Sequence, residues 1–497
     1  MSAETVSHTD DAVDPRRWIV LALIVMAQFM VVLDVAIVNV ALPSIKNSLH
    51  FSQVDLQWVI TAYAILFGGA LMLGGRLGDL LGRRRLFVIG LALFTVSSLL
   101  DGLSWSEGSL IAFRSLQGLG AALVSPAALS ILMTTFNEGR ERNLALGVWG
   151  AVSGSGGAAG VLLGGALTSG LGWSWIFFIN VPVGIAVIAA TPFLLRESIA
   201  DLDHRHFDFA GAASITAGLM LLVYAMTHAA QHGWGATESI VLIGASAALL
   251  VAFFVREMFS PAPLLPLRIF RLRTLSGSNL GGLLLGASVF AQFFLLTLYM
   301  QQVLHYSALS TGVAYIALTL TIILCSGIAQ ALVTRVGVRP VMPAGMLMAA
   351  GALVWMAQLP VHGHYFANLF GPFLLAGLGL ALAFVPMSIG GLTGVSGGEA
   401  GVASGLLNTV QQVGGAIGVA IATTIATTFT THFASAHHTS AAAPAALTHG
   451  FQAAFYVLAG IAAAGGILSA ALIEGRSKLA AAPHEEAGLA QVEATTA

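Results

Sequence analysis

The stretch "VVLDVAIVNVALP" (Val31–Pro43) places one acidic residue, Asp34, inside an apolar run that begins at Trp18. A run of about 20 apolar residues is long enough to cross a bilayer as a helix. An ionised carboxyl in hydrocarbon costs roughly 2.5–3.5 kcal/mol on insertion scales, and acids at such positions are functional by default. The stretch therefore predicts a membrane-spanning helix that carries a functional acid.

The whole chain has the composition of a membrane protein. Its 497 residues are 57% hydrophobic and only 8% charged, whereas soluble domains carry about 25% charged residues. The formal net charge of −2 argues against a nucleic-acid partner. The single cysteine, Cys325, excludes an internal disulfide, and we predict no metal site and no cofactor. The acidic N-terminus lacks the layout of a signal peptide, so the first apolar run is expected to stay as a helix.

Fourteen apolar segments are each long enough to span a bilayer. With the N-terminus on one side, that side receives all of the 20 lysines and arginines except Lys46 and Arg114. The positive-inside rule makes it the cytoplasm, so we expect both termini there and the chain in a bacterial inner membrane. We expect a flexible external loop at Thr431–Gly450. The predicted spans are 18–41, 55–75, 86–104, 109–134, 143–168, 173–195, 209–229, 239–256, 276–301, 311–332, 341–360, 366–390, 401–427 and 451–473.

Two junctions between spans indicate an internal repeat. "GRLGDLLGRRRLF" (Gly75–Phe87) and "VTRVGVRPVM" (Val333–Met342) are both glycine-containing turns that carry arginines. They correspond if spans 1–6 and 9–14 are two six-helix repeats, as in secondary transporters. The predicted fold is an all-α polytopic membrane protein with 14 transmembrane helices, two of them inserted between the repeats. The predicted domains are a cytoplasmic N-terminus (1–17), an N-terminal bundle (18–195), a linker with the two inserted helices (196–275), a C-terminal bundle (276–473) and a disordered cytoplasmic tail (474–497).

Seven motifs in order resemble the major facilitator superfamily. The Gly75–Phe87 junction is similar to its signature loop, and the Val31–Pro43 stretch resembles the first-span motif of its fourteen-span drug:proton antiporters, the EmrB/QacA type. The resemblance implies proton-coupled efflux of amphipathic organic compounds by alternating access. The other matching motifs are "LIAFRSLQGLGAALVSP" (Leu110–Pro126), "WGAVSGSGGAAGVLLGGAL" (Trp149–Leu167), "WIFFINVPVG" (Trp175–Gly184), "PLLPLRIF" (Pro263–Phe270) and "ASGLLNTVQQVGGAIG" (Ala403–Gly418).

Three positions depart from the family pattern. Val161 follows Gly160 where the motif usually has Gly-Pro, Ala36 stands in place of a threonine, and Ser174 stands in place of an arginine. These departures leave the fold prediction intact. They leave open whether Val161 alters coupling and what charge the substrate carries.

Asp34 and Arg114 are the predicted proton-coupling residues. Asp34 lies about 24 Å along its helix from Trp18, and Arg114 about 8 Å into the fourth span, so their depths are compatible. Asp34 is either a carrier that loads a proton outside and releases it inside, or one half of a fixed ion pair with Arg114. We favour the carrier, although both arrangements can occur in different states. Arg114, with Gln117 one turn further on, either holds the proton acceptor in place or hydrogen-bonds the substrate, and the alternative for both residues is packing within the bundle.

Asp79 is the predicted centre of a conformational latch. A carboxylate there can cap a nearby helix and pair with Arg83. The resemblance implies that this latch, with Gly75, Gly78 and Gly82, closes the cytoplasmic side in the outward-facing state. A second motif is a helix-packing seam with glycines at small-xxx-small spacing, which serves either static packing or sliding of the two halves. Its residues are Gly150, Gly154, Gly160 and Gly164.

A substrate cavity requires apolar walls with a few polar groups, and ordinary interhelical hydrogen bonding is an equal alternative for each polar candidate. The expected partners are a small organic substrate, protons and membrane lipid. We expect a monomer and no enzyme activity, and the need for a periplasmic adaptor is left open. The main alternative is a dedicated exporter of one metabolite, antibiotic or siderophore. The cavity candidates are Gln57, Tyr63, Gln117, Gln292, Tyr299, Tyr315, Asn408 and Gln411.

Overall fold

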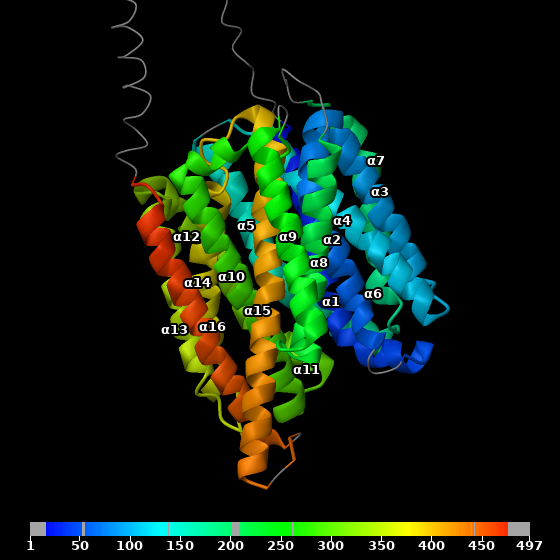
Figure 1. Cartoon of the computed structure of the whole chain (residues 1–497), viewed down its shortest axis with the longest axis vertical. Helices are drawn as coiled ribbons and strands as arrows, with labels where there is room; N and C mark the ends of the chain where they lie inside the picture. The colour runs from blue at the N-terminus through cyan, green and yellow to red at the C-terminus, as the bar shows by residue number, and fades with distance from the viewer. Residues whose placement is uncertain are drawn as a thin grey trace, which may run out of the picture.

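The computed structural model describes residues 16–51, 55–137, 139–199, 208–260, 263–438, 440–441 and 443–475. Within these ranges all regular structure is helical. Thirteen helices are long and apolar enough to cross a membrane, and α5, which bends by 42° beyond Gly157, adds a fourteenth. The long helices run side by side along one direction (Figure 1). The prediction of an all-α polytopic membrane protein with fourteen spans is confirmed.

The first half of the chain forms six spans. The sixth span is divided, because Ile179 interrupts the helix between α6 and α7. The helix α4 begins in a capping box, in which Ser106 and Ser109 satisfy each other's backbone amides. The elements are α1 (Arg17–Leu49), η1 (Asp55–Gln57), α2 (Trp58–Leu81), α3 (Arg83–Gly102), α4 (Glu107–Thr135), α5 (Arg140–Gly170), α6 (Trp175–Phe178) and α7 (Asn180–Leu194).

The second half repeats this pattern of six spans with more interruptions. A π-helical turn closes the first of its spans and another opens the fourth. The elements are η2 (Leu267–Arg271), α10 (Arg273–Leu298), η3 (Tyr299–Val303), α11 (Ala308–Ala314), α12 (Ile316–Val336), α13 (Val338–Met356), η4 (Tyr365–Leu369), α14 (Phe370–Gly390), η5 (Gly397–Glu399), α15 (Ala400–Ala436) and α16 (Pro444–Leu472). The domain bounds predicted from the sequence stay predictions.

Two helices, α8 (Phe209–His232) and α9 (Thr237–Phe259), form the insert. The helix α8 packs against α2, α15 and α9, and Tyr224 stacks on Trp58 of α2 with ring centres 5.8 Å apart. Trp234, after α8, donates a hydrogen bond of 2.8 Å to Thr424 of α15. The insert therefore covers one side of the seam where α2 meets α15.

The predicted flexible loop at Thr431–Gly450 is wrong in extent. The helix α15 continues to Ala436, and α16 begins at Pro444, so most of the segment is helical. Proline is well placed in the first turn of a helix because it has no N–H group to satisfy there. The predicted tail and the positive charges after Gly475 lie outside the described residues.

One end of the molecule carries eight arginines at or near the ends of its helices, and we call it the arginine-rich end. The first and last described helices, α1 and α16, both have their chain-terminal ends there, at the top of Figure 1. The two halves meet along α2 and α15, along α4 and α15, and where α5 contacts α11, α12 and α14. The arginines that define this end are Arg17, Arg83, Arg84, Arg85, Arg140, Arg142, Arg335 and Arg339.

Candidate functional site

The first half of the chain holds a buried ion pair. Asp34, near the middle of α1, lies 2.6 Å from a guanidinium nitrogen of Arg114 on α4, and the two side chains are 0% and 1% exposed. These are the two residues that the sequence placed at compatible depths. In this conformation they form the ion pair that was one of the two predicted arrangements. Such a pair is stable only when its remaining polar atoms are also hydrogen-bonded.

Three more polar side chains complete the surroundings of this pair. The Oδ1 atom of Asp34 accepts hydrogen bonds from the amides of Gln117 at 2.8 Å and Asn180 at 3.0 Å. The same amides lie 2.6 and 3.3 Å from the hydroxyl of Ser98. Gln117 also accepts a hydrogen bond from Arg114. Four helices, α1, α3, α4 and α7, therefore meet at Asp34.

The guanidinium of Arg114 is held from its other sides as well. Its Nε donates a hydrogen bond of 3.1 Å to the carbonyl of Val59 on α2. The guanidinium carbon lies 4.3 Å from the ring centre of Tyr63 and 5.6 Å from that of Phe177. Aromatic faces attract a cation at these distances. Tyr63, which was predicted to line a substrate cavity, contacts Arg114 here.

A second buried acid, Asp101, lies close to this pair and was assigned no role from the sequence. It falls near the end of α3, and it is fully buried. Neither of its carboxyl oxygens has a hydrogen-bond partner among the described residues. It is within electrostatic reach of Arg114 and Asp34. Its position at a helix end concealed this burial, which depends on how α3 packs against α4 and α7.

The predicted latch residue Asp79 joins the two halves of the molecule. Its Oδ1 accepts hydrogen bonds of 2.9 and 3.3 Å from Arg83 on the next helix. The backbone amides of Gly401 and Val402, at the start of α15, donate to its two carboxylate oxygens at 3.1 and 3.2 Å. Exposed amides make the beginning of a helix an anion-binding position. Asp79 is fully buried at this junction.

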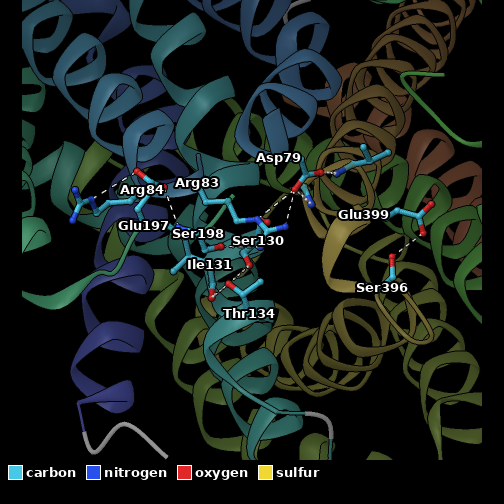
Figure 2. Close-up of polar contacts among 12 residues, drawn as sticks. Asp79, Arg83, Arg84, Ser130, Ile131, Thr134, Glu197, Ser198, Ser396 and Glu399 are labelled. Carbon is cyan, nitrogen blue, oxygen red and sulfur yellow. Dashed lines mark hydrogen bonds and ion pairs between the residues drawn. The ribbon is translucent and has the colours of Figure 1, made fainter. Parts of the chain in front are cut away.

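The segment after α7 reinforces the latch, as Figure 2 shows. Arg83 donates a hydrogen bond of 3.0 Å to Ser198. Glu197 accepts from the backbone amides of Arg84 at 3.1 Å and Arg85 at 3.2 Å, and so caps the start of α3. A negative side chain is favourable at this end of a helix. Glu197 and Ser198 were not predicted, because nothing in their local sequence indicates that they return to the α2–α3 turn.

The three glycines of the predicted latch have different surroundings. A side chain at Gly75 would collide with the carbonyl oxygen of Gly401, so this glycine lets α2 and α15 approach closely. Gly82 has φ +106°, and a Cβ there would lie 2.6 Å from a carboxylate oxygen of Glu197. At Gly78 a Cβ would make only an ordinary contact. Close approach therefore requires Gly75 and Gly82, whereas nothing in the packing requires Gly78.

The predicted seam of α5 faces two different neighbours. Cβ atoms at Gly150 and Gly154 would lie 3.0 and 3.2 Å from Val385 of α14 and Ile322 of α12, in the other half. Cβ atoms at Gly160 and Gly164 would lie 2.8 Å from backbone oxygens of α1. The first pair therefore belongs to the boundary between the halves. The second pair packs α5 against the helix that carries Asp34.

Two of the predicted substrate residues are hydrogen-bonded within the second half. The hydroxyl of Tyr299 donates to the carbonyl of Pro360 at 2.6 Å. The hydroxyl of Tyr315 donates to the carbonyl of Phe293 at 3.0 Å. Gln292 is buried, and its side-chain nitrogen has no partner among the described residues. Of these three, Gln292 retains a donor for a ligand.

Two further candidates lie on α15. The side-chain oxygen of Asn408 lies 3.1 Å from the hydroxyl of Ser125 on α4, which connects the two halves. The amide of Gln411 donates to the carbonyl of Leu407 at 3.2 Å and is half-buried. The side chain of Gln57 lies outside the described part of the structure.

Two cavities open at opposite ends of the molecule. The first, of about 410 Å³, lies at the arginine-rich end between the start of α5 and the second half. The second, of about 490 Å³, lies at the other end beside α1. None of the predicted substrate residues lines either one. The first is lined in part by Arg140, Arg142, Thr334, Thr393 and Glu474, and the second in part by Asn39, Pro43, Lys46 and Gln302.

Two six-helix halves that meet at glycine-lined seams, with a buried charge pair in one of them, are the architecture of secondary membrane transporters. The profile of the Major Facilitator Superfamily matches residues 24–419 and again 279–495. The chain belongs to this superfamily. The resemblance found in the sequence is thereby confirmed.

Individual relatives agree with this assignment. The chain is 40% identical over 403 residues to a cephamycin export protein of Amycolatopsis lactamdurans, covering 80% of this chain and 82% of the relative. It is 38% identical over 483 residues to a puromycin resistance protein of Streptomyces alboniger, covering 96% and 95%. The crystal structure of the human organic anion transporter MFSD10 shares the fold with a TM-score of 0.62, at 17% identity, covering 92% of this chain and 99% of that one.

Proposed function

We propose that this protein exports amphipathic organic compounds in exchange for protons, with Asp34 as the proton carrier. The observation that carries the proposal is the enclosed pair of Asp34 and Arg114, surrounded by neutral amide and hydroxyl groups. Protonation of Asp34 removes the attraction that holds α1 to α4 and frees Arg114 for another partner. A transported proton releases about 2.3 kcal/mol per 100 mV of membrane potential, which can drive export.

The orientation belongs to the same proposal. The arginine-rich end faces the cytoplasm, as the positive-inside rule requires, and both termini are cytoplasmic. The chain then lies in a bacterial inner membrane as a monomer, with the two bundles at 18–195 and 276–473. The contact of Asp79 with the start of α15 then closes the cytoplasmic side.

The relatives favour a second, narrower candidate for the cargo. One is named for export of cephamycin and the other for resistance to puromycin, each a single antibiotic. A dedicated exporter of one antibiotic uses the same fold and the same proton step. The two candidates differ only in how many compounds the transporter accepts.

A transport assay with an imposed gradient tests the proton step. Purified protein in proteoliposomes is given a pH gradient, and uptake of puromycin and of ethidium is followed. We expect Asp34→Asn to abolish gradient-driven transport while gradient-independent exchange persists. Asp208→Asn is the matched control, because Asp208 also pairs with an arginine, Arg256, but lies in the insert, just before α8. Undiminished gradient-driven transport by Asp34→Asn would refute the proposal.

A susceptibility panel in an efflux-deficient host separates the two candidates for cargo. Protection against puromycin, a cephamycin and ethidium together indicates a broad exporter. Protection against one of them alone indicates a dedicated one. Protection in either case should be lost with Asp34→Asn.

A further inference from the structure

Asp101 differs from Asp34, the other buried acid close to Arg114. Asp34 accepts hydrogen bonds from Arg114, Gln117 and Asn180. Asp101 is equally buried, yet neither of its carboxyl oxygens has a partner among the described residues. Burying an ionised carboxylate without donors is strongly unfavourable, whereas the protonated form is tolerated. Asp101 therefore carries a proton in this conformation.

The charges that face Asp101 explain what that proton can do. The charged and titratable groups within its electrostatic reach are Arg114 on α4, Asp34 on α1 and Tyr63 on α2. On α6, the apolar ring of Phe178 covers the neighbouring Gly102. Because Arg114 and Asp34 neutralise each other, a neutral Asp101 leaves the group without net charge.

The same balance is restored if the proton changes place. When Asp34 gains a proton, the positive charge of Arg114 loses its partner in a site that is 1% exposed. Ionisation of Asp101 supplies a new one. Two acids that share one arginine and one proton titrate as a coupled unit. The total charge of the three groups is zero before and after the exchange.

Asp101 also lies on the outer side of this group. It is the next-to-last residue of α3, at the end away from the arginine-rich turn. The following residues Leu103 and Trp105 are 57% and 73% exposed. Arg114 lies seven residues, about 10 Å, into α4 from the same end.

We propose that Asp101 is the outer proton-loading group of this transporter. It takes a proton from the side opposite the arginine-rich end and passes it to Asp34. In that step the carboxyl of Asp101 loses a proton, the carboxylate of Asp34 gains one, and Arg114 stays charged and changes its partner from Asp34 to Asp101. This inference rests on the proposed function of Asp34 as the carrier.

Infrared spectroscopy tests the protonation of Asp101 directly. The purified protein at pH 7 should show the C=O stretch of a buried protonated carboxyl. The band should disappear in Asp101→Asn. It should also weaken in Asp34→Asn, where Arg114 has lost the charge of Asp34 and favours the ionised form of Asp101, and it should persist in Asp208→Asn. Absence of the band from the wild type, or its persistence in Asp101→Asn, overturns the inference. So does failure of Asp101→Asn to fold, because an amide replaces a neutral carboxyl without a change in charge or size.

Gradient-driven uptake of puromycin tests the loading step. At an outer pH of about 8, where protons are scarce, we expect Asp101→Asn to be about tenfold slower than the wild type, because Asp34 must then load without an intermediate group; tenfold in rate corresponds to about 1.4 kcal/mol. At an outer pH of about 6 the rates should converge, and Asp101→Glu should restore the rate at high pH. Equal rates at every pH overturn the inference on Asp101. If Asp34→Asn also transports normally, the proposed function itself fails.

Discussion

The molecule contains two buried Asp–Arg pairs that look alike but are built differently. Asp34 and Arg114 take all their partners from helices of the first half. Asp79 pairs with Arg83 of its own half but also accepts two amide hydrogen bonds from α15 in the other half. Relative motion of the halves therefore breaks the second arrangement and leaves the first intact.

We propose that this difference assigns the two pairs to different steps of transport. A pair within one half responds to a change of charge, since nothing else separates its members. A carboxylate shared between halves responds to a change of conformation, and it stabilises the state in which its amide donors are present. Coupling requires that the first event alter the second. Helix α4 carries Arg114, and α2 accepts a hydrogen bond from it. Both helices also contact α15, so they connect the two pairs.

The largest expected effect comes from removing one arginine from each pair. Arg114→Met leaves Asp34 buried without a countercharge, and we expect the free energy of unfolding to fall by about 3–5 kcal/mol. Arg83→Met should cost less, because two backbone amides still hold Asp79. Thermal unfolding in detergent compares the two. The double variant Asp34→Asn/Arg114→Met should recover most of the loss, and equal losses for both single variants would contradict the comparison.

A bulkier residue at the seam should separate the halves. In Gly401→Ala the new Cβ would lie 2.7 Å from the carboxyl carbon of Asp79, and such overpacking costs about 1–3 kcal/mol. Spin labels at Arg85 and Ser396, on a background with Cys325→Ser, report the separation at the arginine-rich end. We expect the distance between the two labels to be longer in Gly401→Ala than in the protein with Gly401.

Gly108→Ala is the control for this variant, because nothing lies within 4 Å of its added Cβ. An unchanged distance distribution in Gly401→Ala would show that α2 and α15 absorb the methyl group without opening.

Loss of charge at the latch should have a smaller effect than this wedge. Asp79→Asn keeps an acceptor for the amides of α15. The hydrogen bonds are charge-assisted in the wild type, and loss of the charge should weaken them by about 1 kcal/mol. The population with separated labels should rise about fivefold. Asp34→Asn should shift the same distances less than Asp79→Asn does, because Asp34 makes no hydrogen bond to the other half. A similar shift in both variants would mean that the two pairs are not distinct.

The smallest effect is expected at a third pair in the insert, in which Arg256 is exposed and Asp208 is buried. Burial raises the pKa of Asp208, but hydrogen bonds from the Gly211 amide, Arg256 and Ser260 lower it below its usual range. Its stabilising contribution is therefore full above about pH 4 and is lost as the pH falls through the folded-state pKa.

Asp208→Asn keeps the helix cap, so its unfolding free energy should differ from that of the wild type by only a few tenths of a kcal/mol at neutral pH. Thermal melting curves of the wild type and of Asp208→Asn, measured between pH 3 and 7, should become the same at the acidic end of this range. A difference in melting temperature that grows as the pH falls would contradict the expected loss of the contribution of Asp208 in acid.

The depth of each group in the membrane could be predicted from the sequence. The rise of a helix is constant, so counting residues from a span end placed Asp34 and Arg114 at compatible levels before any contact was known. The arginine-bearing turns likewise indicated the two halves. These inferences need only distance along one helix, which the apolar runs define.

The direction in which a side chain points could not be predicted in the same way. Glycines of one seam, Gly150 and Gly160, face different halves because α5 contacts both. Asn180 reaches Asp34, and Ser98 reaches Gln117 and Asn180, only through the packing of α3 and α7 around α1 and α4. Asp101 was overlooked for the same reason, since its burial comes from neighbouring helices and not from its own sequence.

The insert also has a consequence for connectivity. The helix α9 is mostly exposed at its lipid-facing surface and packs chiefly on α8, so it contributes little to the assembly of the halves. It does make the number of inserted helices even. Each crossing of the membrane reverses the direction of the chain, so an even number of inserted helices returns the chain to the side from which the second repeat must start. A gain or loss of α9 alone would turn that repeat upside down.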